Sequence, residues 1–98
     1  MKTVRFLDQD CSVVLANYSS NGRIAIMLLC EDGSPMTTAT SCIDHPMPEG
    51  CTAIKTYSEN EGILEALVEA GIVRETGHTA TNGFAKFPIV EVLVKHLT

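Results

Sequence analysis

The sequence predicts an α+β fold, in which a mostly antiparallel sheet of five or six strands carries one helix, at about residues 59–70, on one face. Three observations lead to this expectation. Short β-rich segments follow one another, Asn-Gly and Asp-Gly turn dipeptides separate several of them, and one amphipathic segment with helix-cap residues lies among them. The 98 residues correspond to a single domain, residues 1–98, and 45% apolar residues are sufficient for a hydrophobic core.

Three strands are expected in the first third of the chain. Residues 3–7 alternate between polar and apolar side chains, which is typical of a short strand. Residues 12–18 and 23–30 are expected to form a hairpin. Asn21 and Gly22 lie between them, and these residue types tolerate the positive φ angles that a type I′ turn requires.

This turn also predicts how the hairpin is paired. A two-residue loop at Asn21 and Gly22 places Leu15 opposite Leu28. Residues 24–30 are apolar on both faces, which predicts a central strand covered on both sides.

The middle of the chain is expected to add two further strands. A turn at residues 32–33 leads into residues 36–43, whose many threonines suit a strand near a sheet edge. Residues 44–51 contain two prolines and are expected to form an irregular link. Residues 52–57 are expected to form a short strand.

The helix is the clearest element of the sequence. Ser58 and Glu61 fit a capping box, in which the two side chains satisfy free backbone N–H groups at the helix start. Gly71 is expected to end the helix in the left-handed conformation, with Ile72 making the closing apolar contact. One face of the helix carries the apolar side chains of Ile63, Leu64, Leu67 and Val68.

The C-terminal part is expected to return to strands. Residues 72–76 and 78–81 form two of them, separated by a turn near Gly77. A second Asn-Gly turn follows at residues 82–83. The β-branched residues at 88–94 predict a last strand, with a short helix over residues 88–97 as the alternative, because proline is common at the first position of a helix.

The acidic residues are concentrated around the helix. The net charge is −5, and residues 44–75 carry seven acids against two cations. Such a chain is not expected to bind nucleic acid, because phosphate contacts require a basic face. A solvated helix face is the simpler interpretation, and a surface for a basic partner is the functional one. The partner-binding residues predicted here are Glu59, Asn60, Glu61, Glu65 and Glu69.

No cofactor or metal is expected. Cys42, His45 and Cys51 have ligand-like spacing, but the turn at residues 32–33 places Cys42 opposite Arg23, far from Cys30 as a fourth ligand. We therefore expect four reduced thiols, used mainly as small apolar side chains. Zinc at the three-residue set stays an open alternative.

Catalytic motifs are not recognisable, so we expect a protein that is not an enzyme. A hydrolase using His45 or His78 is the weakest interpretation. The N-terminus does not resemble a signal peptide, and no apolar run is long enough to span a membrane, which predicts a cytoplasmic protein.

Several motifs resemble an uncharacterised family of small bacterial proteins, a domain of unknown function. The resemblance runs from Asn21 to Val92, and its most specific part is the segment Ser58-Glu-Asn-Glu-Gly with the helix that follows it to Gly71. Members occur in gut bacteria, phages and plasmids. The resemblance implies an accessory protein of a mobile element, a class that includes inhibitors of host defence.

Two functions are consistent with these observations. The first is a small non-enzymatic interaction protein that binds a basic host protein, in the manner of an anti-CRISPR inhibitor. The second is a protein that binds or sequesters a nucleotide signal, with Lys55, Arg74 and Lys86 as phosphate-binding residues. Neither involves a membrane, and a homo-oligomer is compatible with both.

Overall fold

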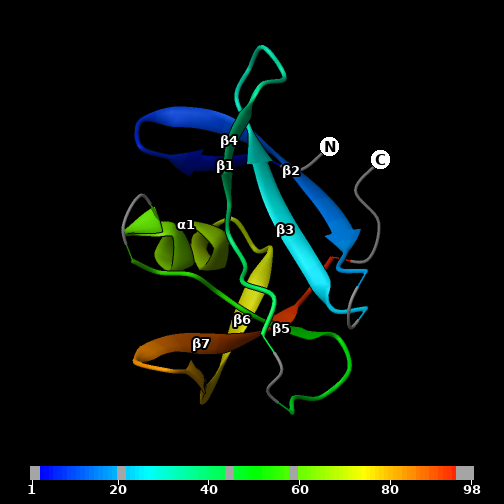
Figure 1. Cartoon of the computed structure of the whole chain (residues 1–98). Helices are drawn as coiled ribbons and strands as arrows, with labels where there is room; N and C mark the ends of the chain where they lie inside the picture. The colour runs from blue at the N-terminus through cyan, green and yellow to red at the C-terminus, as the bar shows by residue number, and fades with distance from the viewer. Residues whose placement is uncertain (1–2, 20–21, 44–45, 58–59, 95–98) are drawn as a thin grey trace.

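The computed structural model describes residues 3–19, 22–43, 46–57 and 60–94 (Figure 1). Over these residues it contains seven strands and one helix. The predicted α+β class and the antiparallel pairing are confirmed. The strands are divided between two sheets, however, where the sequence suggested one. One sheet has the strand order β1-β2-β3-β4, and the other has the order β5-β7-β6.

The first hairpin of the four-stranded sheet turns at Leu7 and Asp8. Phe6 lies opposite Gln9, and both turn residues have positive φ angles, of 51° and 62°. This is the backbone of a type I′ turn without glycine or asparagine, and the sequence gives no signal for it. The strands of this sheet are β1 (Thr3–Phe6), β2 (Gln9–Asn17), β3 (Ile24–Leu29) and β4 (Pro35–Thr38).

The predicted pairing of β2 with β3 is wrong by two residues. Leu15 lies opposite Ile26, not Leu28. The Tyr18 N–H donates to the Arg23 carbonyl at 2.8 Å, so four residues form the loop instead of two. Because the shift is even, every side chain stays on its predicted side of the sheet.

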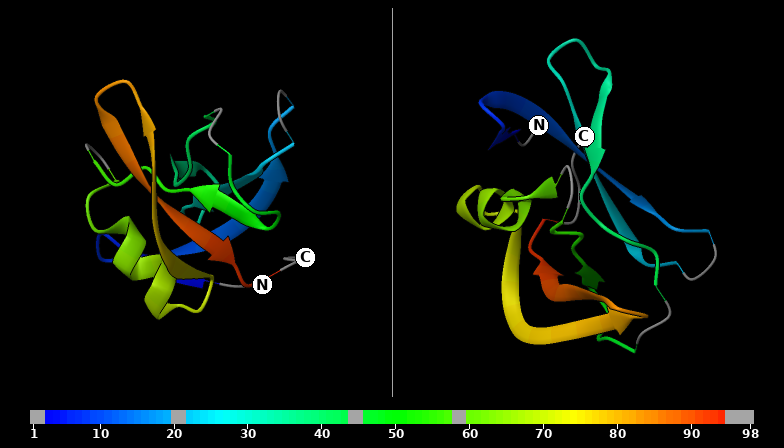
Figure 2. Two further views of the ribbon diagram at one scale, coloured as in Figure 1. Left: turned by 90° about the horizontal axis from the view of Figure 1, so that it is seen from below. Right: turned by 60° about the vertical axis from the view of Figure 1, so that its left-hand side comes forward.

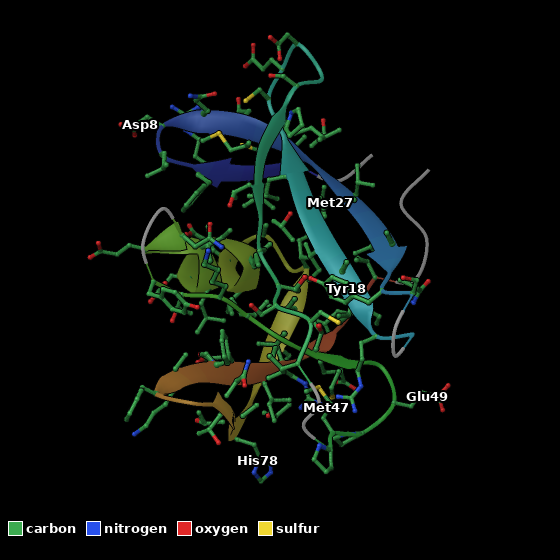
Figure 3. The ribbon with its side chains drawn as sticks, viewed as in Figure 1. Asp8, Tyr18, Met27, Met47, Glu49 and His78 are labelled. Atoms are coloured by element: carbon green, nitrogen blue, oxygen red, sulfur yellow. The ribbon has the colours of Figure 1, made fainter. Side chains whose placement is uncertain are left out.

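β3 is a central strand, as predicted, with β2 and β4 on either side. Its face toward the core is fully covered, since Ile26 and Leu28 are 0% exposed. On the other face Met27 is only half-buried (Figure 3). The turn near residues 32–33 is also confirmed, with Met27 opposite Thr38. The expected strand at 36–43 ends at Thr38 as β4.

The three-stranded sheet contains β5 (Cys51–Ala53), β6 (Val73–Asn82) and β7 (Ala85–Val92). The two strands expected at 72–76 and 78–81 are one strand, β6, with an irregularity between Glu75 and Thr79. Gly77 lies there with a φ of 84°, which explains the turn-like signal. The C-terminal segment is a strand up to Val92, not a helix; residues 95–98 lie outside the described part.

Pro88 lies in β7, the middle strand of this sheet, although proline lacks the N–H that a ladder uses. The regular pairing of β5 with β7 ends at Ala53 opposite Ile89, so it does not include Pro88. Beyond that pair, the Ile54 N–H donates to the Pro88 carbonyl at 3.0 Å. The missing donor therefore falls where the regular pairing with β5 has ended.

The helix α1 (Ile63–Glu69) is shorter than the predicted range of 59–70. It begins after Gly62, which has a left-handed φ of 86°, and no side chain among the described residues caps it. Ser58 of the expected capping box lies outside the described residues. The predicted end is confirmed: Gly71 has a φ of 76°, and the Ile72 N–H donates to the Leu67 carbonyl at 3.0 Å.

The main core lies between the two sheets and is closed at one side by α1 (Figure 2). It unites apolar side chains from both sheets and the helix: Val4, Phe6, Val13, Ile26, Leu28, Ile54, Ile63, Leu67, Ile72, Val73 and Val90. A second cluster on the other side of the three-stranded sheet contains Ile43, Cys51, Ala53, Ala80, Phe87 and Ile89. The three-stranded sheet is thus covered on both faces.

Candidate interaction surface

The helix presents two glutamates and one valine to solvent. Ile63 and Leu67 are 0% exposed, so they define the inward side of α1. At about 100° per residue, Glu65, Val68 and Glu69 are on the opposite side, and all three are exposed. Val68 was expected on the apolar face. Its position about 140° from Ile63 around the helix is the signal that could have placed it outside.

Glu61 extends this surface. It is exposed and precedes the first turn of α1. We call Glu61, Glu65, Val68 and Glu69 the acidic helix face. Glu59, the remaining predicted acid, lies outside the described residues.

No cation among the described residues forms an ion pair with the acidic helix face. Ion pairs form elsewhere, between Arg5 and Asp10 at 3.2 Å and between Arg74 and Glu91 at 2.5 Å. Within the described ranges no residue pairs with the three glutamates, and the last turn of α1 holds no basic residue. Like charges four residues apart on a helix cost about 0.3 kcal/mol, which this surface leaves uncompensated.

The prediction that Asn60 faces a partner needs correction, because its side chain is 0% exposed. The Thr37 hydroxyl donates to Asn60 Oδ1 at 2.5 Å, and Asn60 Nδ2 donates to the Thr38 carbonyl at 2.9 Å. These two hydrogen bonds therefore connect the segment that precedes α1 to the edge strand β4. Its polar atoms are satisfied inside the protein, as buried polar atoms usually are.

The three cations proposed to bind a nucleotide do not lie close together. Lys55 Nζ lies 5.3 Å from the ring centroid of Tyr57, and Arg74 is paired with Glu91. Lys86 is five residues before Glu91 on β7, which separates it from the Arg74 pair by about 17 Å. These three side chains therefore do not build one phosphate site.

A hollow of about 390 Å³ is lined by Asn17, by residues 22–24 and by residues 47–51. Glu49, at its rim, points away from the body of the protein (Figure 3). His78 also points outward, and its ring has no hydrogen-bond partner among the described residues (Figure 3). The nearby Thr76 hydroxyl donates to the Ile89 carbonyl at 2.7 Å. This arrangement offers no paired nucleophile and base.

The two cysteines of the expected metal set differ in their exposure to solvent. Cys42 is exposed and Cys51 is buried, while His45 lies outside the described residues. In the part of the chain that the structure describes, no group of three or more His, Cys, Asp or Glu residues is arranged to hold a metal ion.

No protein-family model, curated protein or solved structure matches the chain. The resemblance over residues 21–92 therefore stays a prediction from the sequence. Within the described ranges, no helix combines the length and the apolar character needed to cross a bilayer.

Proposed function

We propose that this chain is a small non-enzymatic interaction protein that binds a basic partner protein through the acidic helix face. One observation carries the proposal: Glu65 and Glu69 on α1, and Glu61 just before it, are exposed and form no ion pair with any described residue. The repulsion along the helix is a small cost to folding that a cationic partner would remove.

The surface suits fast, selective association. A patch of one charge raises the encounter rate with an oppositely charged protein and disfavours partners of like charge. Val68 lies among the carboxylates with 39% of its surface exposed and adds an apolar contact. An apolar centre with a charged rim is a common arrangement in protein interfaces.

The partner class is a basic protein that handles nucleic acid, since such proteins expose the cations that the acidic helix face would meet. An inhibitor of a host defence enzyme of this kind, encoded on a mobile element and acting in the cytoplasm, is the specific form that we propose. Covering a phosphate-binding surface with carboxylates would block nucleic acid without any catalytic step.

The test is capture of the partner from host lysate with two variants of equal charge. Glu65→Gln/Glu69→Gln removes the two carboxylates of the acidic helix face that lie on α1, and Glu31→Gln/Glu49→Gln removes two exposed acids elsewhere. We expect the first variant to lose the partner and the second to retain it. Equal retention by both variants would exclude the acidic helix face as the binding surface.

A further inference from the structure

Two cysteines far apart in the sequence lie next to each other across the first sheet. The pairing of β2 with β3 places Ser12 opposite Leu29, and the next position on each side is occupied by Cys11 and Cys30. By strand alternation both side chains belong to the core-facing side, like the buried Leu28.

The backbone at this position favours a close approach. The Cys30 N–H donates to the Ser34 carbonyl, and the Ile26 carbonyl accepts from Ala39, both at 2.8 Å. These residues of the β3 segment therefore direct their backbone groups toward the β4 side, away from β2. Extending the register by one position makes Cys11 and Cys30 a non-hydrogen-bonded pair, a type whose Cα atoms are typically about 4.5 Å apart. Disulfides span Cα distances of about 4.4–6.8 Å.

Each thiol has a weak partner in the reduced protein. Cys11 Sγ donates to the Gln9 carbonyl at 3.8 Å, and Cys30 Sγ donates to Met36 Sδ at 3.6 Å. Burial raises the pKa of Cys11, and the nearby Cys30 and Asp10 raise it further. Disulfide formation exchanges two weak contacts for one covalent bond.

The two thiols differ in access. Cys11 is 0% exposed, whereas Cys30 is half-buried and lines an open hollow of about 440 Å³. Because Cys30 is the less buried of the two, a reagent reaches its thiol first, which leaves Cys11 as the second thiol.

The hollow selects reagents by charge. Four carboxylates and one guanidinium line it, and the guanidinium, that of Arg5, is paired with Asp10 at 3.2 Å. Anionic reagents are repelled and cationic ones are attracted. The carboxylates belong to Asp8, Asp10, Glu31 and Asp32.

We infer that Cys11 and Cys30 are a reversible thiol–disulfide site, oxidised by a small cationic or neutral disulfide. The Cys30 thiolate attacks one sulfur of the reagent, forms a mixed disulfide and releases the other half as a thiol. The Cys11 thiol, on losing its proton to water, attacks Cys30 Sγ and releases the second half. The two protein thiols are oxidised to one disulfide, and the reagent is reduced to two thiols.

The experiment treats the fully reduced protein with cystamine, a dicationic disulfide, and follows the mass of the intact chain and of its unreduced peptides. We expect a product lighter by two hydrogen atoms, in which the peptides of Cys11 and Cys30 are linked. Cys42→Ser should form this product at the wild-type rate. Cys11→Ser should stop at a mixed disulfide on Cys30, and Cys30→Ser should give no internal disulfide.

A second arm tests the charge of the hollow. Cystamine should react with the protein faster than the anionic oxidised glutathione does. The ratio of the two rates should be larger for the protein than for a short neutral cysteine peptide, and Glu31→Gln should lower the ratio for the protein. A stable mixed disulfide on wild-type Cys30, or a linkage through Cys42 or Cys51, would overturn the inference. The mapping of the wild-type protein decides this even if the core variant Cys11→Ser does not fold.

Discussion

Thr37 on β4 donates its hydroxyl group to the carboxamide oxygen of Asn60, which lies 23 residues later in the chain, at 2.5 Å. The amide nitrogen of Asn60 returns a hydrogen bond to the next residue of β4, at the Thr38 carbonyl. This bidentate contact covers the edge of the four-stranded sheet with the segment that leads into α1. A residue that the sequence suggested for a partner surface thus joins two elements of the fold.

Replacing Asn60 should destabilise the protein strongly. Asn60→Ala leaves the half-buried Thr37 hydroxyl and the Thr38 carbonyl without their partner, and a polar group that loses its partner away from water costs about 1–3 kcal/mol. We expect the free energy of unfolding to fall by about 2–4 kcal/mol in urea titrations. Thr38→Ala, which removes an exposed side chain and keeps the carbonyl, should change it by less than about 0.5 kcal/mol.

The turn between β1 and β2 should be open to stabilisation. Leu7 and Asp8 both adopt left-handed backbone angles, which cost about 1 kcal/mol for a residue that carries a Cβ. Leu7→Asn/Asp8→Gly supplies the preferred type I′ sequence and should raise the free energy of unfolding by about 1–2 kcal/mol. Leu7→Ala keeps the backbone strain, so an equal gain from that variant would show that removal of an exposed apolar side chain is the cause.

The acidic helix face should govern association kinetics with the captured partner. Glu61→Gln/Glu65→Gln/Glu69→Gln removes three exposed charges, so we expect slower association and a weaker dependence of the rate on ionic strength. Stopped-flow or surface-binding kinetics at several salt concentrations measure both quantities. The fold should persist, with stability equal to or slightly above wild type, because repulsion along α1 decreases. Unchanged rates and salt slopes would indicate a face that only aids solubility.

Asp32 should couple stability to acidic pH. The side-chain and backbone hydrogen bonds from Ser34, at 2.6 Å and 2.9 Å, lower the pKa of Asp32 below its ordinary value of 3.8. A carboxylate whose pKa is lowered by folding contributes stability above its unfolded pKa, and loses it as the pH falls through the folded pKa. In an NMR titration, Ser34→Ala should move the Asp32 pKa upward, toward 3.8. An unchanged pKa would assign the shift to another cause.

Local signals accounted for much of the fold. The end of the helix at Gly71, the turn near residues 32–33 and the central position of β3 were all predictable from the sequence. Each depends on backbone preferences or apolar patterns within about ten residues, and these act before any distant contact forms.

Features that involve distant segments were not predictable. The four-residue loop after Tyr18 shifted the pairing of β2 and β3, and with it brought Cys11 opposite Cys30. Burial of Asn60 depends on β4, which reaches it through the tertiary fold alone. A capping pattern before the helix cannot show whether a nearby polar side chain faces solvent or a sheet edge.

Composition and short-range periodicity are sufficient to predict the fold class, a helix in the 60s and the concentration of acids around it, because these properties are encoded locally. Which residues share a surface depends on how distant segments pack. The tertiary structure split the strands into two sheets with one core between them, and it turned Glu65, Val68 and Glu69 outward. Pairing register and burial depend on which distant segments pack together, and packing free energy is a property of the assembled chain, not of any one segment.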